Sequence, residues 1–267
     1  MLLSRHDVLL QMASICTASL FPNAQRDGQD AILLGGFLLP SSSYVTYTEE
    51  FLQVLGISTR VFPYNDPSLL EQDSSFLVKP ETELLIGHSK GAKTLATWMT
   101  SCTIIPSRSI PCVLIEPVDV DPPGQQSPQR VLELWESNGK ALASIPTLIV
   151  SAPYTQYSSR YGKAANLCAP SGRDSRAFFQ VAMDARRNYP QFAAPLLLLE
   201  FPTLGHNDVT SSTLGGCTDG PGRSLGALAV ATAVAFWILA LRNHDDFLST
   251  MDNEKLALEF NSISFPP

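Results

Sequence analysis

The chain has 267 residues and a formal net charge of -7, from 18 Lys and Arg against 25 Asp and Glu. Its basic residues are scattered and form no basic patch, which argues against a nucleic-acid-binding protein. Five cysteines are too few for a disulfide-built scaffold, and no C-x-x-C spacing suggests a zinc site. Since no internal repeat or linker appears, we expect a single α/β domain over residues 26–267.

The first 25 residues allow two interpretations. A charged start, a short apolar run to Phe21 and the sequence Pro22-Asn23-Ala24-Gln25 are typical of a cleaved leader. Residues 4–10 also resemble a twin-arginine signal with His6 in place of the second arginine. An amphipathic first helix packed on the domain fits the same residues, so both alternatives stay open.

Apolar runs and helical spacings alternate along the middle of the chain. We expect strands at 31–34, 57–62, 84–86, 112–115, 147–150 and 195–201, with helices at 44–55, 92–99 and 174–187. This alternation predicts a mainly parallel sheet with helices on both faces. In such sheets the chemistry gathers at the carboxyl ends of the strands.

Residues 224–241 contain no charged side chain, and this length touches the lower limit for a membrane-spanning helix. The segment is rich in Ala and Gly, and charged residues follow it at 242–246. A helix buried against a sheet needs the same composition. We favour the buried helix.

The sequence Gly87-His88-Ser89-Lys90-Gly91 is a G-x-S-x-G motif. It follows the apolar run 84–86 and precedes a helix-compatible stretch, which is the context of a nucleophile elbow. Glycines on either side of the serine remove Cβ clashes from a strained turn and let the helix start close to the strand. The motif therefore predicts a hydrolase with Ser89 as the nucleophile.

A serine nucleophile needs a base, and the chain has four histidines. His6 lies in the possible leader, and His244 lies among charged residues beyond the C-terminal helix. His88 directly precedes Ser89, so its side chain is expected to point away from Ser89 Oγ. His206 remains, directly after the last strand, and the order of serine first and histidine last is that of α/β-hydrolases.

The triad acid has two candidates after the strand at 112–115. Glu116 is the first carboxylate to emerge at the strand tip, and Pro117 is expected to keep the chain extended through Glu116. Asp119 lies three residues further on, in a loop with Asp121. We expect Glu116 to orient the His206 imidazole, with Asp119 as the alternative acid.

The oxyanion hole should combine two backbone amides. One donor is expected from Lys90, directly after the nucleophile, and the other from Phe37 in the loop after the first strand. Gly35 and Gly36 give that backbone room to approach a substrate carbonyl. Residues 37–39 are apolar and fit either the wall of a substrate cleft or the core.

Several short motifs together resemble those of chlorophyllases. Residues 87–93 look like the Gly-His-Ser-Arg-Gly-Gly-Lys motif of that family, and residues 114–119 like its Leu-Ile-Gly-Ile-Asp-Pro-Val-Asp segment. Residues 36–39 are similar to the oxyanion loop, 167–170 to a Cys-Ala-Pro loop, and 205–209 to the Gly-His-x-Asp-x-Leu around the family's histidine. The similarity runs in order from about residue 31 to about residue 240.

The resemblance implies an α/β-hydrolase fold with reduced N-terminal strands, since only about 30 residues precede the first expected strand. It also implies cleavage of the phytyl ester of chlorophyll to chlorophyllide and phytol, without a cofactor or a catalytic metal. Ser89 matches the family's nucleophile, His206 its base and Glu116 its acid. The implied partner is an apolar ester substrate, with peripheral membrane association allowed and no obligate protein partner. The implied location is the chloroplast, thylakoid-associated or lumenal, with another oxidising compartment such as the secretory space as the alternative.

The chain departs from the family's pattern at four positions. Glu116 replaces an Asp, Lys90 an Arg, Ala92 a Gly, and Gly35 stands where a His is usual. A general carboxylesterase of similar fold acting on other apolar esters therefore stays open, as does a non-enzymatic binding protein.

The resemblance extends to two cysteines. Cys168 and Cys217 have counterparts in the family and fall in loops on either side of the last strand and His206. We expect a disulfide between them that ties down the histidine loop and stabilises the fold by ~2–4 kcal/mol. Cys16, Cys102 and Cys112 are then expected to be free thiols.

Overall fold

The computed structural model describes residues 30–37, 39–63, 82–100, 110–119, 130–154, 173–211, 220 and 223–242. The segment 1–25, expected to be a leader or a first helix, lies outside these residues. So do Cys16, Cys102, Cys168 and Cys217, and their expected thiol and disulfide states stay predictions. Cys112 is described and is a buried free thiol.

The described strands form one parallel sheet in the order β2-β1-β3-β4-β5-β6. The strands are β1 (Asp30–Leu34), β2 (Ser58–Phe62), β3 (Thr82–His88), β4 (Cys112–Ile115), β5 (Thr147–Ser151) and β6 (Leu196–Glu200). Strand β2 lies on one side of β1, and β3 to β6 follow one another on the other side of β1. The prediction of a mainly parallel sheet is confirmed.

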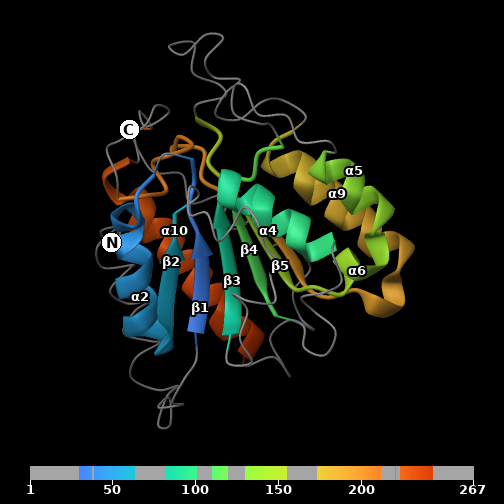
Figure 1. The fold of residues 1–267 in the computed structure, drawn as a ribbon, viewed down its shortest axis with the longest axis horizontal. Helices are drawn as coiled ribbons and strands as arrows, with labels where there is room; N and C mark the ends of the chain where they lie inside the picture. The colour runs from blue at the N-terminus through green and yellow to red at the C-terminus, as the bar shows by residue number, and fades with distance from the viewer. Residues whose placement is uncertain are drawn as a thin grey trace, which may run out of the picture.

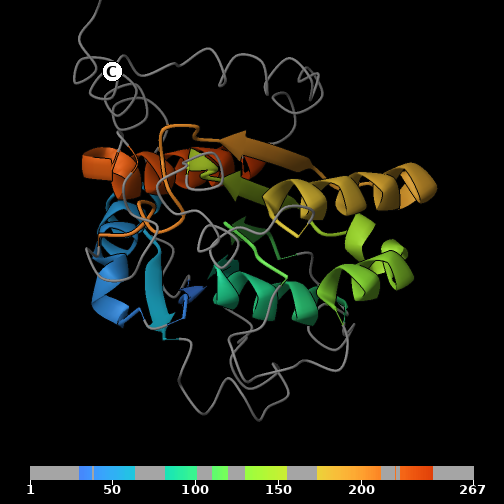
Figure 2. The ribbon, with the colours of Figure 1, turned by 90° about the horizontal axis from the view of Figure 1, so that it is seen from above.

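Helices cover both faces of this sheet. They are α2 (Val45–Leu55), α4 (Lys90–Thr100), α5 (Val131–Ser137), α6 (Gly139–Ala143), α9 (Ser175–Asn188) and α10 (Arg223–Arg242), with 3-10 turns η1 (Ser41–Tyr44) and η4 (Pro190–Phe192). One hydrophobic cluster joins the sheet to α2 and α10, and a second joins it to α4, α5, α6 and α9. Figure 1 shows α4 in front of the sheet and α10 behind it, and Figure 2 shows the same layers from above.

Strand β1 illustrates how the sequence produces this three-layer core. Ala31 and Leu33 belong to the cluster under α2 and α10, whereas Ile32 and Leu34 belong to the cluster under α4. Side chains alternate between the two faces of a strand, so a strand covered on both faces must be apolar at every position. The uninterrupted apolar runs of the sequence are therefore the expected signature of this sheet.

The uncharged segment near the C-terminus is the helix α10, and its prediction as a buried helix is confirmed. Val230, Val234, Ala235 and Ile238 are all buried in the cluster that α10 shares with α2 and the sheet. In the part of the chain that the structure describes, no helix combines the length and the apolar character that crossing a membrane requires.

Candidate active site

A sharp turn at Ser89 joins β3 to α4. Ser89 has a φ of 53°, in the left-handed region that non-glycine residues seldom adopt. Its backbone N–H donates to the carbonyl of Ile115 on the neighbouring strand over 2.8 Å. The strand, the strained serine and the helix that starts one residue later have the backbone geometry that holds the nucleophile in α/β-hydrolases.

Two glycines allow this turn by close backbone packing. A Cβ atom on Gly91 would lie 2.2 Å from the carbonyl oxygen of Leu34, and one on Gly87 would lie 2.5 Å from the Cα of Ala92. Both distances are far below a van der Waals contact, and both neighbours are backbone atoms that cannot move aside. The elbow therefore requires glycine at both positions.

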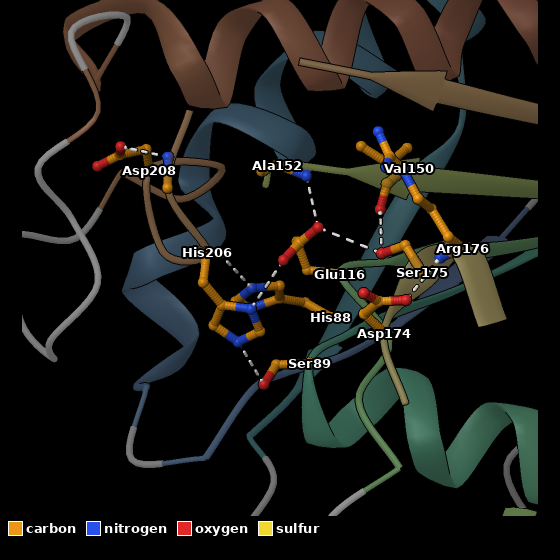
Figure 3. Close-up of polar contacts among 11 residues, drawn as sticks. His88, Ser89, Glu116, Val150, Ala152, Asp174, Ser175, Arg176, His206 and Asp208 are labelled. Atoms are coloured by element: carbon orange, nitrogen blue, oxygen red, sulfur yellow. Dashed lines mark hydrogen bonds and ion pairs between the residues drawn. The ribbon is translucent and has the colours of Figure 1, made fainter. Parts of the chain in front are cut away.

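Ser89, His206 and Glu116 are connected by two hydrogen bonds (Figure 3). His206 Nε2 lies 2.8 Å from Ser89 Oγ, and His206 Nδ1 lies 3.0 Å from Glu116 Oε2. A carboxylate only accepts, so Nδ1 carries the imidazole proton and Nε2 is left to accept the serine hydroxyl proton. This is the arrangement of a serine nucleophile, a base and an orienting acid.

The Glu116 carboxylate is buried and held from two further directions. Its Oε1 accepts from the backbone N–H of Ala152 at the tip of β5 and from the hydroxyl of Ser175, which lies 3.2 Å away. Ser175 Oγ also lies 3.2 Å from the carbonyl oxygen of Val150. The carboxylate therefore lies across the ends of β4 and β5, with its second oxygen directed at His206.

The expectation that the strand stays extended through Glu116 is wrong. Strand β4 ends at Ile115, and Glu116 has a φ of 47°. A following proline disfavours the right-handed helical region for Glu116, but it does not impose an extended chain. The left-handed turn instead points the side chain back over the strand ends, where Ala152 and His206 meet it.

Asp119, the alternative acid, has other partners. Its two carboxylate oxygens accept from the backbone N–H groups of Val131 and Leu132, at 3.2 and 3.3 Å. Lys93 Nζ on α4 lies 3.3 Å from Oδ1, and both side chains of this ion pair are buried. Asp119 thus caps the start of α5 and pairs with α4, whereas Glu116 contacts His206.

A tight loop carries His206. Asp208 Oδ2 accepts from the N–H of Gly205 and from the N–H of Gly220, each over 2.7 Å. These bonds tie the residues around His206 to the segment that leads into α10. Asp208 was not predicted as a site residue from the sequence. Its position two residues after His206 is the one sequence signal that could have indicated a role in holding this loop.

The loop after β1 lies directly against the nucleophile. A Cβ atom on Gly36 would lie 3.3 Å from the Cβ of Ser89. Lys90 follows Ser89 and begins α4, and Phe37 follows Gly36, so both residues expected to supply the oxyanion hole are chain neighbours of residues at this contact. Of the apolar residues in this loop, Phe37 is 44% exposed and Leu39 belongs to the core, while Leu38 lies outside the described residues.

His88 lies behind the triad. Its ring centroid is 5.4 Å from that of His206, and its Nε2 lies 3.2 Å from the backbone carbonyl oxygen of His206. Burial, and next the nearby His206, lower the pKa of His88 to about 3, so its imidazole is neutral. The elimination of His88 as the base agrees with this contact, but its place beside His206 was not expected.

Among the described residues, no group of three or more His, Cys, Asp or Glu side chains has the arrangement of a metal site. Comparisons with models of known protein families and with curated proteins give no match. Among solved structures, the chain is similar to the crystal structure of LpqC, a poly(3-hydroxybutyrate) depolymerase from Bordetella parapertussis. The TM-score is 0.45 with 13% sequence identity, and the match covers 88% of this chain and 85% of that one.

Proposed function

We propose that this protein is a serine ester hydrolase with Ser89 as nucleophile, His206 as general base and Glu116 as the acid that orients His206. The observation that carries the proposal is the continuous chain of hydrogen bonds from Ser89 Oγ through both nitrogens of His206 to Glu116. It starts at a strained elbow at the carboxyl edge of a parallel sheet, where such enzymes hold their nucleophile.

In the first half of the reaction, Ser89 Oγ attacks the carbonyl carbon of the ester while His206 Nε2 takes the hydroxyl proton. The tetrahedral intermediate then expels the alcohol, which leaves with the proton from Nε2, and an acyl-serine ester remains. Glu116 stabilises the transient imidazolium through Nδ1–H, because its carboxylate is already in hydrogen-bonding distance.

In the second half, water attacks the acyl carbon and His206 Nε2 takes the proton of that water. Collapse of the second intermediate returns the proton to Ser89 Oγ and releases the carboxylic acid. We assign the negative oxygen of both intermediates to the backbone amides of Phe37 and Lys90. An oxyanion donor of this kind contributes about 2.7–4 kcal/mol to transition-state stabilisation.

The finer proposal concerns the ester. The ordered motifs at 36–39, 87–93, 114–119 and 205–209 support the phytyl ester of chlorophyll as substrate, and with it a chloroplast location. The half-exposed Phe37 ring, next to the loop that touches Ser89, supports an apolar substrate of some kind. A carboxylesterase acting on other apolar esters fits that second observation equally, and only the substrate test separates the two.

The test incubates the full chain with chlorophyll a and, separately, with p-nitrophenyl butyrate, and follows chlorophyllide and nitrophenol. Ser89→Ala is the matched inactive variant, because it removes only the hydroxyl. A fluorophosphonate probe, which reacts with activated serines, is applied to both proteins. We expect wild type to be labelled at Ser89 and to release both products, and Ser89→Ala to do neither.

The outcomes distinguish the proposed substrate from the proposed type of reaction. Nitrophenol release without chlorophyllide would refute chlorophyll as substrate and favour the general carboxylesterase. A wild-type protein that is neither labelled nor active on either ester would refute ester hydrolysis and favour a non-enzymatic binding protein of this fold.

A further inference from the structure

We infer that Tyr44 and His88 are positioning residues that connect the loop of Gly36 and Phe37 to the loop of His206, behind the nucleophile. This inference rests on the proposed function, since it assigns the oxyanion loop and the catalytic base a common support. Three hydrogen bonds among buried groups carry it.

The chain of bonds starts at the oxyanion loop. The backbone N–H of Gly36 donates to the Tyr44 hydroxyl over 2.6 Å, and that hydroxyl lies 2.8 Å from His88 Nδ1. His88 Nε2 lies 3.2 Å from the carbonyl oxygen of His206. Tyr44 and His88 are each about 1% exposed, so water does not replace any of these partners.

The direction of every bond in this chain is determined. An amide N–H only donates and a carbonyl oxygen only accepts, so the Tyr44 oxygen accepts from Gly36, and His88 Nε2 carries a proton for His206. The neutral His88 ring is then an acceptor at Nδ1, and Tyr44 donates to it. Burial keeps both rings in these forms, because it raises the pKa of Tyr44 and lowers that of His88.

The two ends of this chain of hydrogen bonds both contact Ser89. Gly36 packs against Ser89, with only 3.3 Å between the Ser89 Cβ and a Cβ built at Gly36. His206 contacts the Ser89 hydroxyl through Nε2. The distance between the oxyanion donors and the base is therefore fixed by Tyr44 and His88 rather than by either loop alone.

A neutral His88 also does not repel the positive charge that forms on His206 during the proposed reaction. The His88 ring faces His206, Tyr44 and the Gly36 backbone, and its centroid lies 5.4 Å from that of the ring on which the imidazolium would form. A second cation in that place would oppose proton transfer to His206. A polar but uncharged ring supports the loop without this cost.

The test compares Tyr44→Phe with Tyr47→Phe. Tyr47 lies on the next turn, is equally buried, and donates its hydroxyl over 2.7 Å to the carbonyl of Val209, in the loop of His206. Tyr47→Phe therefore loses one buried hydrogen bond to the same loop, but one that does not connect this loop to Gly36. Tyr44→Phe removes both hydrogen bonds of the Tyr44 hydroxyl. We expect it to lower kcat about five- to thirtyfold with KM within about twofold, because both bonds position groups that act in the transition state. Tyr47→Phe should stay within about threefold of the wild-type kcat, although it also loses thermal stability through its one lost hydrogen bond.

A second pair tests His88. His88→Phe keeps an aromatic ring but removes both bonds, whereas His88→Gln keeps an N–H able to reach the His206 carbonyl. We expect His88→Gln to recover at least about threefold in kcat over His88→Phe. Equal kcat for these two variants, or equal kcat for Tyr44→Phe and Tyr47→Phe, would overturn the positioning role.

A measurement without substrate tests the positioning role independently of the proposed ester hydrolysis. The proton NMR signal of the His206 Nδ1–H reports how firmly the imidazole is held against Glu116. We expect the signal to shift or broaden in Tyr44→Phe and to stay unchanged in Tyr47→Phe. If wild type hydrolyses no ester, the proposed function fails, but this spectrum still shows whether Tyr44 positions His206. An unchanged spectrum in Tyr44→Phe would overturn the positioning role of Tyr44.

Discussion

In the proposed mechanism Ser89 and His206 act on the same proton, so neither side chain has a separate contribution to catalysis. The distance of 2.8 Å between Ser89 Oγ and His206 Nε2 means that the hydroxyl is already poised for transfer. Ser89→Ala, His206→Ala and the double variant should therefore have similar residual rates.

The measurement is the initial rate of p-nitrophenyl butyrate hydrolysis by the three variants, each checked for folding by circular dichroism. We expect kcat to fall at least ~10²-fold in every case, within the usual range for general-base catalysis. A His206→Ala protein that retains more than about a tenth of the wild-type kcat would remove His206 from its role as base.

Two buried carboxylates, Glu116 and Asp119, follow β4. Neutralising the first should lower activity, and neutralising the second should lower stability. Glu116→Gln keeps the shape but loses the charge that stabilises the imidazolium, so kcat should fall ~10²–10⁴-fold. Asp119→Asn removes the negative charge that faces the buried Lys93 ammonium, and the free energy of unfolding should fall by about 3 kcal/mol, with kcat reduced less than about tenfold. Steady-state kinetics and urea titration of both variants give the ranking, and the reverse ranking would make Asp119 the acid.

His88 should also make stability depend on pH. Its pKa is about 3 in the folded chain and 6.5 ordinarily, so the unfolded chain binds the proton more tightly. The free energy of unfolding therefore decreases as the pH is lowered below about 6.5, by at most ~1.4 kcal/mol per pH unit. Above about pH 6.5 this group does not affect it. In His88→Gln this part of the slope should disappear.

The slope is obtained from urea titrations of wild type and His88→Gln at several values between about pH 7 and about pH 4. Other groups titrate in both proteins, so the difference between the two curves isolates His88. Parallel curves would mean that His88 is not held neutral by the fold.

At the scale of elements, the packing of α4 on β1 depends on Gly91. Gly91→Ala would drive a Cβ into the Leu34 carbonyl, 2.2 Å away, so α4 must move off the sheet and the elbow with it. Gly139→Ala is the matched control, because the closest neighbour of its Cβ would be the ring edge of Tyr189, 3.1 Å away, a side chain and not a backbone atom. We expect Gly91→Ala to lose about 3 kcal/mol or more and most activity, and Gly139→Ala to lose less than about 1 kcal/mol. Thermal melts and ester hydrolysis rates check both, and equal losses would contradict the packing argument.

Arg186 on α9 joins the starts of β5 and β6, at the edge of the sheet opposite to the site. Its guanidinium donates to the carbonyls of Ile145, Ala182 and Ala194 over 2.6, 3.1 and 2.8 Å. Burial lowers its pKa to about 10, which still leaves it charged at neutral pH.

Arg186→Lys should lower the free energy of unfolding by about 2–4 kcal/mol, because an ammonium cannot reach all these carbonyls and buried acceptors are left unpaired. Arg187→Lys is the control, since the Arg187 side chain is 64% exposed and should cost less than about 0.5 kcal/mol. Both variants should keep kcat within about twofold, and urea titration with ester assays measures the two quantities. A large loss of kcat in Arg186→Lys would contradict the separation between this contact and the site.

The elements that the sequence predicted are those whose pattern is local. Uniform apolar runs located β4 and β5 to within one residue, and Asp174, which accepts from the N–H groups of Arg176 and Ala177, marks the start of α9. The helices α5 and α6 were not predicted. The cap of α5 comes from Asp119, twelve residues before Val131, so no capping signal stands next to the helix itself.

At the scale of the whole molecule, the same distinction applies to the site. Ser89 has a contiguous motif and His206 was reached by elimination and chain order, so both candidates could be named from the sequence. The supports from Tyr44, Ala152 and Ser175 depend on the strand order, which brings the ends of β1, β3, β4 and β5 to one edge. No local pattern carries that information, and the left-handed turn at Glu116 likewise follows from contacts across the sheet.

Among the described helices, α10, the last in the chain, packs on α2, which lies near the start of the described residues. Helix α10 shares a core with α2, its Thr232 hydroxyl lies 3.3 Å from a carboxylate oxygen of Glu50, and Asp208 ties the loop of His206 to Gly220 just before α10. Ser89 and His206 are 117 residues apart in the chain. While the polypeptide is being synthesised, the elbow therefore emerges from the ribosome long before its base, and the base is not fixed until α10 has emerged. Under the proposed mechanism, a nascent chain therefore gains its activity only after α10 has been synthesised and has packed on α2.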